Sequence, residues 1–210
     1  MNELSQVRQC RLLDSRVHPP LLIDATLSRG FSADMLEDVE VRWRPARIRL
    51  ATAMAAAGLN LENGHWDWRN KAGLVQSNKL LIFSVQCDGE VQGLMALVTR
   101  PRPAHQLPAG SVVYVDFLES APWNLGGEGV QQPRFMGVGT VLIGAAVQES
   151  LDLGFGGRVG LHSLPQAVSF YSGRCQMTRC GEDPKYYDLE YLEYGDDVAL
   201  QWLTDKGLRE

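Results

Sequence analysis

The sequence predicts a single-domain protein of the mixed α/β class, within a chain of 210 residues. Three observations predict it. Apolar residues alternate with period two in some segments and recur with helical spacing in others. An Asp-Gly pair joins two apolar runs, and a glycine-containing turn precedes an apolar helix. We expect a mostly antiparallel sheet of six or seven strands with helices on both faces.

The first 76 residues predict one strand followed by helices. Residues 6–13 alternate well enough for a strand, and residues 19–59 are interpreted as mostly helical. Within that stretch we expect Pro45 at a first turn, because a helix interior does not tolerate proline. Gly58 would end the helix. A second helix is expected through residues 65–76.

A β-hairpin is predicted next. Residues 79–87 and 90–100 are apolar runs separated by Asp88 and Gly89. Such a pair supplies the positive φ angles that a tight turn needs. Residues 111–120 predict a third, largely apolar strand, which we expect at the centre of the sheet.

The rest of the chain alternates between helix and strand. A polar, glycine-rich loop over residues 121–133 leads into an apolar helix that stops near Gly154. After it we expect a strand, a short helix, an edge strand rich in tyrosine and a terminal helix, at residues 158–164, 165–173, 186–194 and 196–203.

Composition excludes several classes of protein. Hydrophobic residues make up 45% and charged residues 21% of the chain, which is ordinary for a globular protein. The net charge of −5 argues against nucleic acid as a partner, because proteins that bind it usually carry a basic excess. The N-terminal segment is charged and contains no apolar targeting or membrane sequence, so we expect a cytoplasmic protein. The four cysteines are scattered, and no metal site is expected.

The stretch RFMGVGTVLIGAAVQES, residues 134–150, places an arginine and two glycines at the start of a helix. Glycine in a first turn costs up to about 1 kcal/mol relative to alanine, so it needs a local reason. Free N–H groups and the helix dipole bind phosphate there, and missing Cβ atoms let the anion come close. The pattern is R-x-x-G-x-G, filled by Arg134, Gly137 and Gly139.

This motif and its surroundings resemble the GCN5-related N-acetyltransferases (GNAT family) over roughly residues 80–194. The similarity consists of R-x-x-G-x-G opening a helix, the strand before it, and the strand and A-x-x-F-Y helix after it. It implies one GNAT-like domain over residues 1–210, a cleft at the splayed centre of the sheet, and acetyl-CoA as co-substrate. It implies that loop amides hold the pyrophosphate and that the preceding strand pairs with the pantetheine arm. The residues so assigned to the coenzyme are Leu118, Arg134, Phe135, Met136, Gly137, Val138, Gly139 and Thr140.

Two residues are the candidates for proton transfer. The resemblance implies that Tyr171 protonates the departing thiolate, and the alternative is a packed aromatic side chain. The sequence departs from the family pattern at Leu164, which replaces the usual Asn, and at SGRCQM after the tyrosine. Glu119, near the end of the central strand, is the candidate base, with Asp116 and a water chain as alternatives.

The acceptor amine is expected to meet aromatic side chains. Trp66 and Trp68 suit an ammonium group through cation–π contact, although both could instead cover the core. Trp123 and Asn124 have the same two interpretations. His162, within a strand pattern, is interpreted as structural. The arginine run RWRPARIR is interpreted as a solvated face, with a patch for coenzyme phosphates or RNA as the alternative.

These features predict an enzyme that moves an acetyl group from acetyl-CoA to a primary amine by direct attack. Catalysis would come mainly from holding amine and thioester in attack geometry. The alternative is a catalytically degenerate, coenzyme-binding protein of the same fold that regulates or tethers a partner. The amine, small molecule or protein, stays open, and no membrane partner is expected. The strand at residues 186–194 could pair with a second copy as an exposed edge, forming a homodimer.

Overall fold

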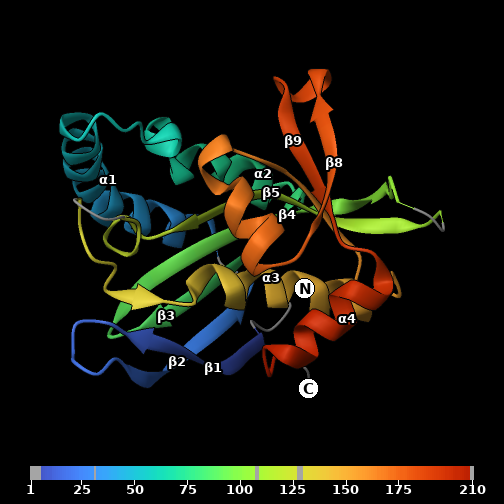
Figure 1. The fold of residues 1–210 in the computed structure, drawn as a ribbon, viewed down its shortest axis with the longest axis horizontal. Coiled ribbons are helices and arrows are strands. Elements are labelled where there is room, and N and C mark those ends of the chain that lie inside the picture. The colour runs from blue at the N-terminus through green and yellow to red at the C-terminus, as the bar shows by residue number, and fades with distance from the viewer. Residues whose placement is uncertain (1–5, 31, 107–108, 127–129, 209–210) are drawn as a thin grey trace. The chain divides into compact units, whose positions relative to one another are not determined.

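The computed structural model of the protein describes residues 6–30, 32–106, 109–126 and 130–208 (Figure 1). Part of the loop expected over residues 121–133 lies outside the described residues. The chain divides into two compact units. The first comprises Met1–Met95 and Leu118–Leu142, and the second comprises Ala96–Phe117 and Ile143–Glu210.

Within the described residues, nine strands form a sheet in the order β6-β1-β2-β3-β4-β5-β7-β9-β8. The strands are β1 Gln6–Asp14, β2 Leu21–Arg29, β3 Leu80–Cys87, β4 Glu90–Pro103, β5 Ser111–Ser120, β6 Phe135–Met136, β7 Val159–Ser163, β8 Thr178–Asp183 and β9 Leu189–Glu193. β5 and β7 pair in parallel, whereas β1 with β2 and with β6, β2 with β3, and β9 with β7 and with β8 are antiparallel. The mostly antiparallel α/β class is confirmed, and the expectation of six or seven strands is wrong.

Strand β2 corrects the helical interpretation of residues 19–59. All nine of its residues pair with β1, from Gln6↔Arg29 to Asp14↔Leu21. Hydrogen bonds along this whole ladder outweigh the helical preference of the leucines, because propensity is a weak local bias. The spacing of apolar residues therefore does not distinguish β2 from the helix that follows it in the sequence.

Helix α1, Ala33–Ala56, takes the rest of that segment. The Ser32 side chain caps it by accepting a hydrogen bond from the Met35 N–H. Gly58, with φ of +71°, follows its end as expected. Pro45 lies inside the helix rather than in its first turn, which corrects the prediction. Proline there costs about 3 kcal/mol, and burial of one helix face offsets the cost. The apolar residues buried on that face are Leu36, Val39, Trp43 and Leu50.

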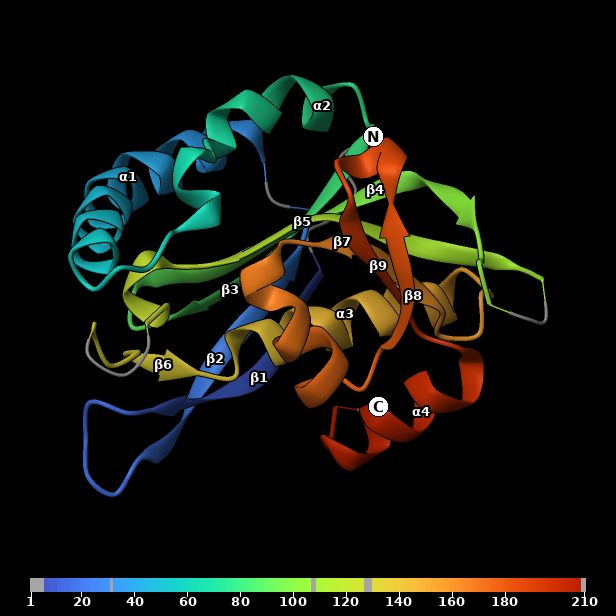
Figure 2. The ribbon, with the colours of Figure 1, turned by 45° about the horizontal axis from the view of Figure 1, so that its top comes forward.

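The predicted second helix is instead three short segments, η1 Glu62–His65, η2 Trp68–Lys71 and α2 Ala72–Gln76. They lie along α1, as Figure 2 shows. The break between η1 and η2 turns Trp68 into the interior, where its side chain is fully buried.

The hairpin of β3 and β4 agrees with the sequence. Asp88 and Gly89 have φ angles of +56° and +72°, as a two-residue hairpin turn requires. β5 lies between β4 and β7 in the strand order, so it is an interior strand as predicted. Helix α3, Val138–Asp152, follows the glycine motif, and Gly154 lies just past its end.

The second unit ends with the β8–β9 hairpin (Figure 1) and helix α4, Asp196–Asp205. β9 pairs with both β7 and β8, so the interpretation of the tyrosine-rich segment as an exposed edge is wrong. β9 therefore offers no free edge to a second copy. The edge strand next to β9 is β8. The sequence does not predict β8, because its residues are mostly polar and exposed and its register shifts between Arg179 and Gly181.

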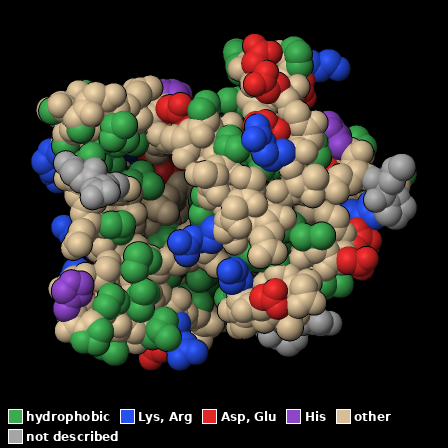
Figure 3. Space-filling view, in the orientation of Figure 1, with side chains coloured by type: hydrophobic (Ala, Val, Ile, Leu, Met, Phe, Trp, Pro, Cys, Tyr) green, Lys and Arg blue, Asp and Glu red, His purple; other side chains and the backbone are tan. Residues whose placement is uncertain are grey.

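Every helix in the described part of the chain is too short or too polar to cross a membrane. Figure 3 shows acidic and basic side chains interspersed on the face in view.

Candidate functional site

The start of α3 has the geometry of an anion site. Gly137 has φ of +98°, a conformation that residues with a Cβ rarely adopt. Its carbonyl oxygen accepts a hydrogen bond from the Val141 N–H at 3.0 Å, so Gly137 is the N-cap. The N–H groups of Val138, Gly139 and Thr140 therefore have no carbonyl partner inside the helix. They lie at the positive end of the dipole of a 15-residue helix.

The first turn of α3 packs directly against β4. A Cβ at Gly93 would overlap the Val138 side chain and would lie 3.1 Å from Leu142 Cδ1. Val138 and Leu142 are buried at 2% and 0% exposure. Glycine at position 93 thus lets the helix lie close to the strand, which fixes where the free N–H groups of the first turn point.

Trp123 and Asn124 hold the chain that leads into this turn. Asn124 Oδ1 accepts from the Phe135 N–H at 3.0 Å, and the Trp123 carbonyl oxygen accepts from the Arg134 N–H at 3.0 Å. Both side chains donate to Gln92 Oε1, at 2.8 Å from Trp123 Nε1 and 2.9 Å from Asn124 Nδ2. The two residues predicted to contact the acceptor amine therefore support the glycine loop, and acceptor contact stays a prediction.

A buried ionic cluster joins α1 to the end of β5. Arg47 donates to Glu40 at 2.7 and 3.3 Å and to Glu119 at 3.0 and 3.2 Å. Asn63 Nδ2 and Trp68 Nε1 donate to Glu119 at 2.8 and 2.6 Å. Arg47 and Glu119 are each 2% exposed and Glu40 is 1% exposed. We call these five residues the Arg47 cluster.

The Arg47 cluster corrects the interpretation of RWRPARIR as a solvated face. The exposed members of the run are Arg42, Arg44 and Arg49, whereas Arg47 is buried. The sequence already contains an indication that Arg47 is buried. Glu40 lies three residues before Trp43 and Arg47 lies four residues after it, so all three fall on one face of a helix. Charged residues on an apolar stripe indicate an internal ion pair.

Glu119 is engaged on both carboxylate oxygens. Burial raises the pKa of its carboxyl, and the Arg47 guanidinium opposes that shift. Four hydrogen bonds from protein groups reach the two oxygens. This is the geometry of a structural carboxylate that fixes the end of β5, and it fits poorly with a base that must accept a proton from an incoming amine.

A lysine of the protein itself makes cation–π contacts with the two tryptophans predicted to contact the acceptor amine. The Lys71 ammonium lies 5.8 Å from the centre of the Trp66 ring and 5.2 Å from that of Trp68. Trp68 is fully buried, which agrees with the alternative interpretation that it belongs to the core. Trp66 is half-buried. Of this pair, Trp66 has the surface that a ligand could contact.

Tyr171 lies in the second unit, in the π-helical segment η5 Phe170–Arg174, which follows η4 Pro165–Ala167. A short helix is thus confirmed at the predicted place. Tyr171 is 7% exposed, and its ring meets that of Phe170 edge-on with centres 5.1 Å apart. Burial raises the pKa of its hydroxyl, so the group keeps its proton through the neutral range. Its role as an acid stays a prediction.

His162 is fixed within the second unit. Its Nδ1 lies 2.7 Å from the Tyr114 hydroxyl, and its Nε2 lies 3.3 Å from Asp183 Oδ2. Tyr186 stacks on the imidazole with ring centres 3.9 Å apart, and burial lowers the pKa of His162. These contacts agree with the structural interpretation.

Solved structures share this arrangement of strands and helices. A GNAT-family acetyltransferase from Listeria monocytogenes is similar with a TM-score of 0.51 at 10% identity, over 88% of this chain and 99% of that one. The chain has the GNAT fold. A structure described as a bacterial toxin has a TM-score of 0.51 at 11% identity, over 99% of this chain and 98% of that one. The PaiA N-acetyltransferase of Thermoplasma acidophilum, in complex with coenzyme A, has a TM-score of 0.48 at 15% identity, over 80% and 97% of the two chains.

Identities this low establish the GNAT fold and nothing finer. No protein-family model and no curated protein matches the sequence. Among the residues that the structure describes, no three His, Cys, Asp or Glu side chains are grouped as metal ligands.

Proposed function

We propose that this GNAT-fold protein binds acetyl-CoA at the start of α3 and transfers the acetyl group to a primary amine. The observation that carries the proposal is the turn at Gly137, where a positive φ and unpartnered helical N–H groups meet the dipole of α3. The pyrophosphate would accept from the N–H groups of Val138, Gly139 and Thr140. The remaining residues assigned to the coenzyme are Arg134, Phe135 and Met136 beside this turn and Leu118 on β5.

Positioning would supply most of the catalysis. Holding an amine against a thioester in attack geometry removes an entropic barrier of several kcal/mol. The Arg47 cluster serves that purpose by fixing the strand end that follows Leu118, with Glu119 as its anchor. We assign Glu119 a positioning role, and the amine would lose its proton to water or to Asp116, which is half-exposed on β5.

Tyr171 would act on the leaving thiolate. Its raised pKa makes full proton transfer unfavourable, because the accepting thiolate is the conjugate base of a thiol with a pKa of about 8.5. The hydroxyl would therefore stabilise the developing thiolate charge by donating a hydrogen bond. The thiolate would take its proton from water, which balances the proton that the amine gives up to water or Asp116.

The test of coenzyme binding uses Thr140, the third residue of α3. Thr140→Glu should leave the helix intact, because an acidic residue in the first turn interacts favourably with the dipole. It should weaken acetyl-CoA binding tenfold or more, since unit charges about 4 Å apart near a surface interact by about 4 kcal/mol. Thr140→Gln is the neutral control of the same size. Calorimetry that finds equal affinities for the two variants would contradict binding of pyrophosphate at this turn.

The second candidate function is coenzyme binding without chemistry. It is favoured by the engagement of both Glu119 oxygens and by the burial of Tyr171, since neither group is set up for free proton exchange. A panel of small amines and peptide N-termini distinguishes the two. Acetylated product supports the enzyme, whereas tight acetyl-CoA binding with no product from any amine supports the binding module.

A further inference from the structure

A cluster of aromatic and titratable side chains in the second unit takes no part in the proposed function. His162 on β7 lies at its centre, between Tyr114 on β5 and Asp183 at the end of β8. Tyr186, in the connection between β8 and β9, stacks on the imidazole, and Arg102 on β4 donates to the Tyr186 hydroxyl at 2.5 Å. We call these five residues the His162 cluster. It attaches the β8–β9 connection to β4, β5 and β7 of the sheet.

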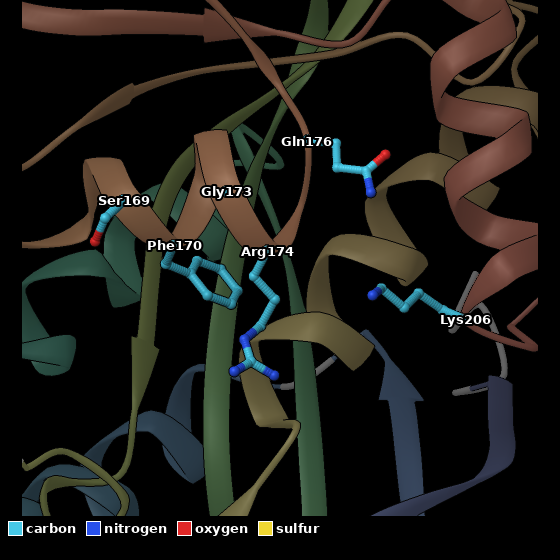
Figure 4. A pocket seen from close by; sticks show the side chains of 6 residues that line it. All are labelled: Ser169, Phe170, Gly173, Arg174, Gln176 and Lys206. Atoms are coloured by element: carbon cyan, nitrogen blue, oxygen red, sulfur yellow. The ribbon is translucent and has the colours of Figure 1, made fainter.

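The His162 cluster is separate from the groove of about 560 Å³ in the same unit. Figure 4 shows the side chains that line that groove, which are Ser169, Phe170, Gly173, Arg174, Gln176 and Lys206. None of these residues belongs to the cluster, so a ligand in the groove would not contact the imidazole. A proton, by contrast, can reach the His162 side chain, which is 6% exposed.

The partners of His162 select one protonation state of its ring. Nε2 lies 3.3 Å from a carboxylate oxygen of Asp183, and Nδ1 lies 2.7 Å from the Tyr114 hydroxyl. A carboxylate only accepts hydrogen bonds, so we assign the ring hydrogen to Nε2. Nδ1 is then an acceptor, and the Tyr114 hydroxyl donates to it. The closed cluster therefore fits a neutral imidazole.

A second proton on the ring disturbs this arrangement. Nδ1 becomes a donor, and the hydroxyl of Tyr114, which is 3% exposed, loses the acceptor for its own hydrogen. The imidazolium also faces Arg102, whose guanidinium lies 3.5 Å from the centre of the Tyr114 ring. Burial, Arg102 and His105 lower the pKa of His162, and the opposing effect of Asp183 does not outweigh them. The closed cluster thus disfavours the charged ring.

Two further elements bring polar groups against the imidazole. Tyr191 on β9 has its ring centre 4.9 Å from that of His162, and its hydroxyl donates to Glu193 at 2.7 Å. The His105 ring, in the loop after β4, lies 4.2 Å from that of Tyr191. Glu193 also accepts from the N–H groups of His105 and Gln106. Burial raises the pKa of Tyr191, so it keeps its proton, and His105 is the imidazole whose titration an experiment must separate from that of His162.

The connection between β8 and β9 is strained. Tyr187 and Asp188 have φ angles of +58° and +59°, which residues with a Cβ rarely adopt. Tyr186 is half-buried, whereas Tyr187 is 92% exposed. Within the connection, the Lys185 N–H donates to Asp183 Oδ1 at 2.9 Å and the Asp188 N–H donates to the Asp183 carbonyl oxygen at 3.1 Å. Release of Tyr186 from the imidazole would let the strained residues relax and would expose these two N–H groups to exchange.

We propose that the His162 cluster is a pH-sensitive latch, which the neutral imidazole closes at neutral pH and which opens when His162 takes up a proton. Opening would move residues 184–188 away from the imidazole and from Arg102. The latch does not depend on acetyl transfer, because none of its residues is assigned to the coenzyme or to the acceptor amine. The competing explanation is a structural core that stays closed at every pH at which the protein is folded.

The direction of the pH dependence follows from the ring. A histidine whose pKa is lowered by closure stabilises the closed form fully above the ordinary value of 6.5, and this contribution is lost as pH falls below 6.5. Each pH unit then favours the open form by up to about tenfold until the pKa of the closed form is reached. Asp183 stays ionised in this range, because the hydrogen bond from the Lys185 N–H lowers its pKa.

Hydrogen exchange of the Lys185 and Asp188 amides tests the latch, with each rate divided by the intrinsic rate at the same pH. In the wild type, protection should fall by up to about tenfold between about pH 7.5 and about pH 5.5. His162→Gln keeps a donor and an acceptor but cannot titrate, so its protection should be equal at the two pH values. His105→Gln is the matched control and should retain the pH dependence of the wild type.

Tyr114→Phe should move the transition without abolishing it. Without the hydroxyl, protonation of Nδ1 leaves no buried donor unsatisfied, so opening should begin closer to pH 6.5. NMR of the ring nitrogens measures the tautomer and the pKa of His162 in the wild type and in Tyr114→Phe. This measurement keeps the latch testable even where His162→Gln does not fold.

The outcomes distinguish a latch from a permanently closed core. Wild-type protection that is the same at both pH values overturns the latch, and so does a fall that persists in His162→Gln. A fall that is lost in His105→Gln but kept in His162→Gln assigns the response to His105 and also overturns it. A neutral ring with its hydrogen on Nδ1 contradicts the hydrogen bonds from which the latch follows. Loss of the response in His162→Gln alone, with an upward shift in Tyr114→Phe, supports it.

Discussion

Removal of Arg47 should destabilise the protein more than removal of any neighbouring arginine. Arg47→Met keeps a side chain of similar length and deletes the guanidinium that lies between two buried carboxylates. Five hydrogen bonds are lost, two to Glu40, two to Glu119 and one to the Trp66 carbonyl oxygen. The carboxylates then remain buried without a counter-charge.

Breaking a buried ion pair by removing one partner costs about 3–5 kcal/mol. For a chain of 210 residues, each kcal/mol shifts the melting temperature by about 2–4 °C. The expected decrease for Arg47→Met is therefore about 6–20 °C. It should be accompanied by a lower urea midpoint with little change in m-value, because the surface exposed on unfolding is similar.

The loss should depend on pH with a definite sign. Burial already raises the pKa of Glu119 above its ordinary 4.5, and without Arg47 the hydrogen bond from Trp68 is left to oppose burial and the charge of Glu40. A carboxyl whose folded pKa is raised contributes its full stability below the unfolded value, and this contribution falls as pH rises through the folded value. Arg47→Met should therefore differ least from the wild type near pH 4.5 and most above neutrality.

Urea unfolding followed by tryptophan fluorescence, repeated across pH, measures both effects. Arg49→Met is the matched control, because Arg49 is exposed two residues further along α1, and it should stay within about 0.5 kcal/mol of the wild type. If Arg47→Met is too unstable to purify, the all-neutral combination with Glu40→Gln and Glu119→Gln should recover part of the stability. A loss for Arg47→Met that equals that of Arg49→Met, or one that grows toward acid pH, refutes the buried ion pair.

Three further predictions concern the loop and the proposed chemistry. Gly93→Ala should destabilise the protein by about 1–3 kcal/mol in urea unfolding, because the new methyl group overlaps Val138, and an unchanged midpoint would show that α3 does not lie against β4. Asn124→Ala should cost about 1–3 kcal/mol by leaving the Phe135 N–H without its acceptor, and hydrogen exchange of that amide should accelerate; unaltered exchange would rule out this support. Tyr171→Phe should lower turnover roughly 10²-fold while acetyl-CoA affinity stays within a few-fold, and turnover at the parental rate would show that the thiolate leaves without a hydrogen bond from Tyr171.

The parts of the fold that the sequence predicts are those with local causes. Asp88 and Gly89 dictate a hairpin turn through their own φ angles. Gly58 and Gly154 end helices for the same reason. The helix after Gly137 is predicted because its apolar residues repeat over four turns. Each of these signals acts within a few residues, so a single sequence contains it.

The parts that the sequence does not predict depend on distant partners. β2 is a strand because β1 pairs with all nine of its residues, and nothing within its own sequence demands that pairing. β8 is held by β9 while exposing polar side chains, so it lacks any apolar pattern. Arg47 is buried because Glu119, 72 residues away, supplies the opposite charge. Pattern analysis cannot detect a stabilising partner at such separations.

The same distinction applies to the acceptor site. Trp68, Trp123, Asn124 and Glu119 were predicted to meet the amine because of their chemistry, yet their polar atoms are satisfied by protein groups. Substitution of any of these four residues should therefore lower the stability of the protein more than it changes the specificity for the amine. Specificity should instead depend on half-exposed side chains, and Trp66 is a half-exposed aromatic residue whose carbonyl oxygen accepts a hydrogen bond from Arg47. Trp66→Phe should thus change KM for the amine without lowering the melting temperature, whereas Trp68→Phe should lower the melting temperature because Glu119 loses its indole donor. A reversed result, in which Trp66→Phe affects only stability, would assign Trp66 to the framework and leave the amine to other residues.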